Sequence, residues 1–201
     1  MKLHILLIIL TLLISAFSLS DEGLNVIKSE SGFLFVFNDS QESFLVEIKG
    51  KKFIDVEPEE LIFSIDGQIV QFTVVPLKEF FEENLNSDTL QQHFDYEFDF
   101  IKKNFKVSAK PIIQRSKFGR KVYYWELDRD LSHSDTSSET IVRQLFATTN
   151  IDSFVIMISS PITRSNDYKQ CRKKIVEALK NIKFQKGKYD LEALRDSLMK
   201  K

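Results

Sequence analysis

The stretch from residue 139 to residue 161 constrains the fold more than any other part of the chain. It holds two apolar runs rich in β-branched residues, 141–148 and 154–159, separated by the short turn sequence TNID. Side chains in the first run alternate between two sets, one with Phe146 and the other with Leu145, which is the period of a half-buried strand. The pattern therefore predicts a hairpin of two central strands.

A second hairpin is predicted at Asp66-Gly67, because this dipeptide between two alternating apolar runs is the strongest short-range hairpin signal in the chain. Residues 21–32 are polar, and we expect a loose leader there. Further strands are predicted at 32–37, at 43–48 and on both sides of the turn SKFG. The buried residues expected on central strands are Trp125, Phe146 and Ile156.

Three segments show the helical period instead, with apolar residues recurring every three or four positions. They are 88–104 with Leu90, Phe94 and Phe98, 165–184 with Cys171, Ile175 and Leu179, and 189–201 with Leu191, Leu194 and Leu198. The mixture of hairpins and amphipathic helices predicts an α+β fold. The length of 201 residues and the hydrophobic content of 43% favour a single domain, and eighteen phenylalanines predict a phenylalanine-rich core.

The first twenty residues have the pattern of a secretory signal peptide. Lys2 precedes an apolar run from Ile5 to Phe17, and small residues lead up to a cleavage point before Asp21. The run of 13 residues is shorter than the roughly 20 that cross a membrane, although an uncleaved anchor is the alternative. The expected organisation is a signal peptide at 1–20, an α+β domain at 21–186 and a C-terminal helix at 187–201.

The charge balance argues against nucleic acid and anionic membranes as partners. Without residues 1–20, the chain keeps 27 basic and 29 acidic residues, which gives a formal charge of −2. The one cysteine cannot form an intramolecular disulfide, so the fold depends on its core alone.

The segment from about 105 to 184 resembles the PsbP-like superfamily, which includes extrinsic photosystem II subunits and exported bacterial proteins. The likeness rests on the order of four features: Gly119 before the strand RKVYYWEL, then RQLFAT, then SFVIMISSP, and a helix that ends on ALKNIKF. The resemblance implies an antiparallel β-sheet packed by helices on its faces, a PsbP-like α/β/α sandwich, in a largely non-enzymatic family. The chain before residue 88 departs from the family pattern.

One polar loop has the oxygen spacing of a calcium site. Positions 1, 3, 5, 7, 9 and 12 of a twelve-residue loop are occupied by Asp128, Asp130, Ser132, Ser134, Thr136 and Glu139. Position 6, which needs glycine for the sharp turn, is His133, and the flanking segments read as strands rather than helices. An ordinary solvated hairpin loop is therefore the preferred interpretation, with calcium binding as the alternative.

Candidate catalytic side chains are dispersed along the chain. Cys171 is a possible nucleophile with His93 or His133 as its base, but it lies on an apolar helix stripe and reads better as a buried hydrophobic residue. We expect His93 to be a partly covered surface residue. Asp95 and Asp99 share one helix face, which reads as a charged solvent face, whereas Glu97 points elsewhere.

These patterns favour a periplasmic or secreted, non-catalytic binding or assembly protein of the bacterial cell envelope, without a cofactor. A partner protein would meet a sheet face or the stripe of Leu191, Leu194 and Leu198 on the terminal helix. The alternative for this stripe is that it docks on its own domain, because a short helix is marginal without packing. The alternative function is a hydrolase with an unrecognised site.

Overall fold

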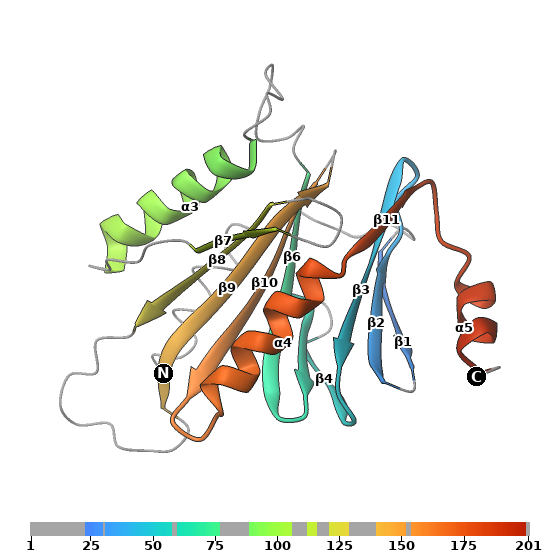
Figure 1. Cartoon of the computed structure of the whole chain (residues 1–201), viewed down its shortest axis with the longest axis horizontal. Coiled ribbons are helices and arrows are strands. Elements are labelled where there is room, and N and C mark those ends of the chain that lie inside the picture. The colour runs from blue at the N-terminus through green and yellow to red at the C-terminus, as the bar shows by residue number, and fades with distance from the viewer. Residues whose placement is uncertain are drawn as a thin grey trace.

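A computed structural model of the chain contains two antiparallel β-sheets and, among the described residues, three helices (Figure 1). The structure describes residues 23–29, 31–57, 60–76, 89–105, 112–115, 121–128, 140–151 and 154–199. The predicted α+β class is confirmed. No helix within these ranges is long and apolar enough to cross a membrane.

The larger sheet has seven strands, with the predicted hairpin of residues 139–161 at its centre. Its order is β4 (Phe53–Glu57), β5 (Ile62–Ile65), β6 (Gln68–Pro76), β10 (Phe154–Thr163), β9 (Ile141–Ile151), β8 (Lys121–Asp128) and β7 (Ile112–Arg115). The hairpin is fixed by pairs such as Ile156 opposite Thr149. The predicted central positions are confirmed, because Trp125, Phe146 and Ile156 are all buried in this sheet.

The smaller sheet is built from the first strands of the chain and one late strand. Its order is β1 (Leu24–Lys28), β2 (Gly32–Phe37), β3 (Glu42–Lys49) and β11 (Lys183–Lys186). The prediction of a loose leader at 21–32 was wrong for residues 24–28, because Val26 and Ile27 pair with β2 and pack on apolar neighbours. The second predicted helix segment, 165–184, also ends earlier than expected, and residues 183–186 pair with β3 instead.

The helices cover three different sheet faces (Figure 1). Helix α4 (Tyr168–Lys180) and the smaller sheet pack on the same face of the larger sheet, and α3 (Thr89–Phe105) packs on the opposite face. Helix α5 (Leu191–Met199) lies on the outer face of the smaller sheet. The layers therefore run from α5 through the smaller sheet to the larger sheet, and then to α3.

Phenylalanine rings fill the space between the two sheets, as the composition predicted. Phe35 of β2 lies 4.5 Å from Phe72 of β6 and 5.2 Å from Phe63 of β5, measured between ring centroids. On the other face of the larger sheet, Trp125 stacks on Phe146 with centroids 3.9 Å apart and planes 7° apart. This alternation between faces follows from the period of two in a strand.

The hairpin predicted at Asp66-Gly67 joins β5 to β6 and is confirmed. Asp66 has φ 55° and Gly67 has φ 81°, so both central residues adopt the left-handed region. That is the requirement of a two-residue type I′ turn, which aspartate and glycine meet at the lowest steric cost.

Candidate functional site

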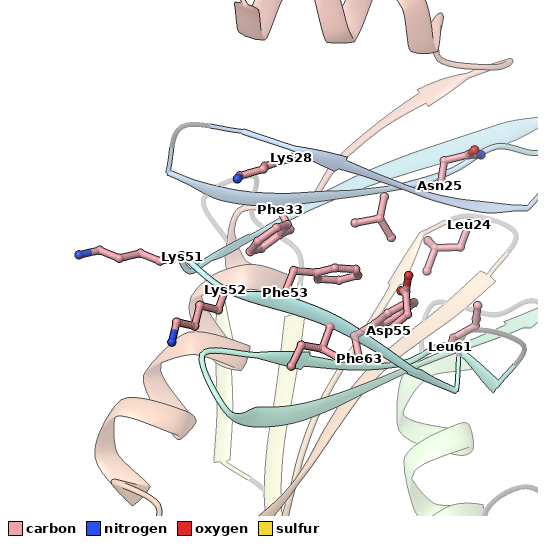
Figure 2. A pocket seen from close by; sticks show the side chains of 12 residues that line it. Leu24, Asn25, Lys28, Phe33, Lys51, Lys52, Phe53, Asp55, Leu61 and Phe63 are labelled. Atoms are coloured by element: carbon pink, nitrogen blue, oxygen red, sulfur yellow. The ribbon is translucent and has the colours of Figure 1, made fainter.

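A groove of about 810 Å³ lies between β1 of the smaller sheet and β4 of the larger sheet (Figure 2). Among the residues that the structure describes, each of these strands is the last strand of its sheet, so the groove runs between two sheet edges. Its volume falls in the range of roughly 300–1,000 Å³ that is usual for sites of small ligands. This is the candidate functional site.

The floor of the groove is aromatic. Phe53 of β4 lies 4.9 Å from Phe33 of β2 and 5.4 Å from Phe63 of β5, measured between ring centroids. Leu24 and Val26 of β1 add aliphatic side chains on the opposite wall. The floor is continuous with the core between the sheets, so these rings are held in place by packing.

Positive charge gathers at one end of the groove, where Lys28, Lys51 and Lys52 lie, all three of them exposed (Figure 2). Leu24 and Leu61 lie toward the other end, where the exposed carboxylate of Asp55 also lies. A ligand with one anionic end would meet attraction at the lysine end and repulsion near Asp55.

Hydrogen bonds to the β5–β6 turn hold the lysine end of the groove in place. Asp66 Oδ1 accepts hydrogen bonds from the backbone N–H groups of Lys51 and Lys52, both at 2.9 Å. Asp66 Oδ2 lies 3.5 Å from Lys174 Nζ of α4. Partial burial opposes ionisation, but these backbone hydrogen bonds and Lys174 outweigh it and lower the pKa of Asp66 below its ordinary value.

Gly50 lies just before Lys51 and Lys52, where the chain bends into β4. It permits the close approach of this bend to the β5–β6 turn. A Cβ at residue 50 would lie 2.4 Å from Cγ2 of Ile65 and 2.9 Å from a carboxylate oxygen of Asp66. A larger residue at this position would force Ile65, the Asp66 carboxylate or the backbone at residue 50 to shift.

Both walls present backbone groups that their own sheets do not use. Ser29 N–H donates to Gly32 O at 2.8 Å and Asn38 N–H donates to Gly23 O at 3.3 Å, so the odd-numbered residues of β1 bond to β2. By the alternation of antiparallel pairing, Leu24, Val26 and Lys28 direct their N–H and C=O groups to the open edge.

The same reasoning applies to β4. Asp66 N–H donates to Lys52 O at 3.0 Å, so Phe53 and Asp55 direct their backbone groups outward. The pairing of β4 with β5 is interrupted by a bulge between Asp55 and Glu57, whereas β1 pairs with β2 without interruption.

Of the predicted calcium ligands, only Asp128 lies within the described residues. Its carboxylate accepts a hydrogen bond from Arg143 Nε at 2.6 Å. No three metal-ligating side chains converge in the described part of the chain. The other predicted ligands, Asp130, Ser132, Ser134, Thr136 and Glu139, lie outside the described residues, as does His133.

Cys171 is buried on α4, as predicted, with 6% of its surface exposed. Burial raises the pKa of its thiol, with a smaller opposing effect from Lys174, so the reactive thiolate is disfavoured. The interpretation of Cys171 as a small buried hydrophobic residue is therefore supported. His93 lies on α3, which packs on the opposite face of the larger sheet from α4, so the two are not brought together.

The prediction that His93 is a partly covered surface residue was wrong. Only 6% of its surface is exposed, because it shares the sheet-facing side of α3 with Leu90 and Phe94. Burial lowers the pKa of this imidazole to about 4, so it is neutral at pH 7. The charged face of α3 is as predicted: Asp95 and Asp99 are exposed, while Glu97 is half-buried and has a raised pKa.

The leucines of the terminal helix lie against the chain's own smaller sheet. Leu191, Leu194 and Leu198 pack on a cluster formed by Ile27, Leu34, Val36 and Leu45. Asp190 caps the helix by accepting from the N–H groups of Glu192 and Ala193, both at 3.0 Å. The alternative prediction, that this stripe docks on its own domain, is therefore the one that the structure supports. The three leucines do not form an open surface for a partner.

No pattern in the sequence predicted the groove. Its walls come from two segments about 25 residues apart, and its floor from two different sheets. The only local signal was the run Lys51-Lys52-Phe53 after a glycine, which has no unique structural interpretation. A comparison of the chain with protein-family models, with curated proteins and with solved structures finds no match.

Proposed function

We propose that this chain is an exported binding protein that holds a ligand with an apolar body and a negatively charged end in the groove between β1 and β4. The observation that carries the proposal is the partly exposed ring of Phe53, which is supported by the buried rings of Phe33 and Phe63, flanked by Leu24 and Val26, and has three lysines at one end.

The apolar body would supply most of the affinity. Each Å² of apolar surface removed from water contributes about 25 cal/mol, before the cost of association is subtracted. The rings of the floor are packed against the core, so little conformational entropy is lost when a ligand covers them. An apolar body lying over Phe53, Leu24 and Val26, which keep exposed surface, is therefore the main source of binding free energy.

The lysines would supply orientation more than affinity. All three side chains are exposed, and an exposed ion pair contributes only about 0.2–1 kcal/mol. Added salt should therefore weaken binding modestly without abolishing it. Asp55 disfavours an anion at the end of the groove away from the lysines, which fixes the direction of an asymmetric ligand.

A binding role fits the chemistry of the lining better than catalysis does. The titratable side chains among the described lining residues are the three lysines and Asp55. Acid–base and nucleophilic catalysis need groups within hydrogen-bond reach of one another, oriented toward one reacting atom. Here the charged groups stand on an exposed rim around an apolar floor, which is an arrangement suited to recognition.

Export to the bacterial cell envelope is part of this proposal, and it rests on the signal-peptide pattern of residues 1–20. N-terminal sequencing of protein recovered from the periplasm or medium should start near Asp21. Recovery of the intact chain from the cytoplasm alone would contradict it. The likeness to the PsbP-like superfamily stays a prediction, and the proposed site does not depend on it.

The binding site is tested with anilinonaphthalene sulfonate, a fluorescent probe with an apolar body and one anionic group. The double variant Lys51→Glu, Lys52→Glu should bind it about tenfold more weakly at low salt, because two attractive charges become repulsive. Phe53→Asp should abolish binding by placing a charge in the floor. The matched control is Lys169→Glu, Lys173→Glu, the same charge change at exposed positions of α4.

Circular dichroism should first show that all variants are folded. The proposal requires that the control binds the probe as the wild type does. Equal affinities for the wild type and both groove variants would overturn it, because the probe would then bind elsewhere or without the lysines.

A further inference from the structure

The edge of β1 offers a more specific kind of recognition than the floor alone. Rows of unpaired backbone groups on a sheet edge are templates for an added strand, and natural proteins protect edges that should stay free. The edges of β1 and β4 are protected to different degrees, and this difference indicates which of them can accept an added strand.

Strand β4 carries two of the usual protections. The bulge between Asp55 and Glu57 interrupts its pairing, and the carboxylate of Asp55 projects beside the edge into the groove. Strand β1 has no bulge, and its one charged side chain, Lys28, stands at its last residue. Its five residues pair with β2 in unbroken register, from Leu24 opposite Phe37 to Lys28 opposite Phe33.

We propose that the groove receives an extended peptide segment of a partner protein, added as an antiparallel strand to the free edge of β1, with an acidic side chain at its N-terminal end. This inference rests on the proposed function, since it names the class of ligand for the same groove. The backbone groups that receive the strand are those of Leu24, Val26 and Lys28.

Side-chain geometry fits this arrangement. Leu24, Val26 and Lys28 point their side chains into the groove, so the residues that hydrogen-bond with them on an added strand point the same way. Alternate side chains of the segment would lie over Phe33, Phe53 and Phe63, and the others would face solvent. The segment should therefore alternate apolar and polar residues.

Charge sets the direction. Lys28 is the last residue of β1, and Lys51 and Lys52 stand at the same end of the groove (Figure 2). A strand antiparallel to β1 places its N-terminal residue at this end, where an acidic side chain meets three positive charges. Asp55 repels a second acid farther along, so the following inward-facing residues should be neutral and apolar.

The test uses acetyl-Glu-Thr-Val-Thr-Val-Thr-amide, whose glutamate and valines share one face of a strand. Affinity for the full mature chain is measured by displacement of anilinonaphthalene sulfonate. In one analogue both valine amides are N-methylated, which removes the N–H groups aimed at β1. In the matched control two threonine amides are N-methylated, so the number of methyl groups is the same but the edge-facing donors remain.

We expect the parent peptide to displace the probe. Methylation of the valine amides should lower the affinity of the peptide about tenfold, and methylation of the threonine amides should change it little. On the protein side, Val26→Pro should weaken the peptide in the same way, because it removes an outward N–H without breaking a bond to β2. Val26→Ala is its control, since it shortens the side chain but keeps the N–H.

The outcomes separate the two proposals. If the probe binds the groove but the peptide fails to displace it, or valine methylation has no effect, strand addition is overturned while the proposed binding function stands. If threonine methylation alone weakens the peptide, the valine N–H groups do not pair with β1 and the proposal is overturned. If valine methylation weakens the peptide but Val26→Pro does not, the strand does not pair with β1 and the assignment to this edge is wrong. If the groove variants do not change probe binding, the proposed function fails as well.

Discussion

Asp66 and Lys52 are joined by two reciprocal hydrogen bonds: the Lys52 N–H donates to the Asp66 carboxylate at 2.9 Å, and the Asp66 N–H donates to the Lys52 carbonyl at 3.0 Å. Lys52 is the last residue before β4, and Asp66 is the first residue of the β5–β6 turn. A turn that is recognisable in the sequence thus fixes the start of one wall of the groove.

Replacing Asp66 should damage both stability and binding. Asp66→Ala removes the acceptor of two backbone N–H groups and places alanine at φ 55°, which should cost about 2–3 kcal/mol in the free energy of unfolding. Asp66→Asn is the control, because it keeps an acceptor oxygen and tolerates this φ. Urea unfolding measures the difference, and equal stabilities of the two variants would contradict the bracing role.

His93 should make the chain lose stability in acid. Its pKa is about 4 in the folded state and about 6.5 when exposed, so below pH 6.5 the unfolded chain binds a proton that the folded chain does not. The free energy of unfolding should fall by about 3 kcal/mol between pH 6.5 and pH 4 from this residue.

The variant His93→Gln isolates this effect. Glu97, whose raised pKa acts in the opposite direction, is present in both proteins and cancels in the comparison. Urea unfolding at pH 7 and pH 4.5 should show a smaller acid loss for the variant. An identical loss in the two proteins would show that His93 is accessible in the folded state.

The strands and the local turns were predictable, because their signals lie in adjacent residues. The alternation in 141–148 separates Phe146 from Leu145, and the structure places these two residues in different cores, on opposite faces of the larger sheet. Asp66-Gly67 likewise specifies its own turn from two residues, since both adopt positive φ. The residues needed for each inference stand side by side in the chain.

The division into two sheets, and the groove between them, were not predictable in this way. Strand β1 looked polar because Asn25 and Lys28 interrupt its apolar residues, and its stability comes from pairing with β2 and from packing by distant residues. His93 was misjudged for a related reason: its burial depends on which sheet α3 covers. Tertiary contacts outweighed local preference at these positions.

Phe146→Ala should destabilise the chain by about 3–5 kcal/mol, because it deletes a buried ring that stacks on Trp125 and leaves a cavity. The matched control is Tyr96→Ala, which removes an aromatic ring that is 56% exposed on α3 and should change stability by less than about 0.5 kcal/mol. Thermal and urea unfolding measure both. Similar small effects would place Phe146 outside the core.

Removal of residues 187–201 should lower the melting temperature clearly. Helix α5 covers Ile27, Leu34, Val36 and Leu45, and its loss would expose this apolar surface to water. A control variant, Arg195→Ala, Asp196→Ala, changes exposed positions of the same helix and should leave the melting temperature nearly unchanged. An unchanged melting temperature after truncation would instead favour a partner-binding role for the helix.

The most direct measurement maps where a ligand binds. Backbone amide shifts of the mature chain are recorded by NMR during titration with anilinonaphthalene sulfonate. We predict that the largest changes fall at residues 24–28 on β1 and 51–55 around β4, the two walls of the groove. Changes concentrated on α3 or α5, with both walls unaffected, would contradict the claim that this groove is the binding site.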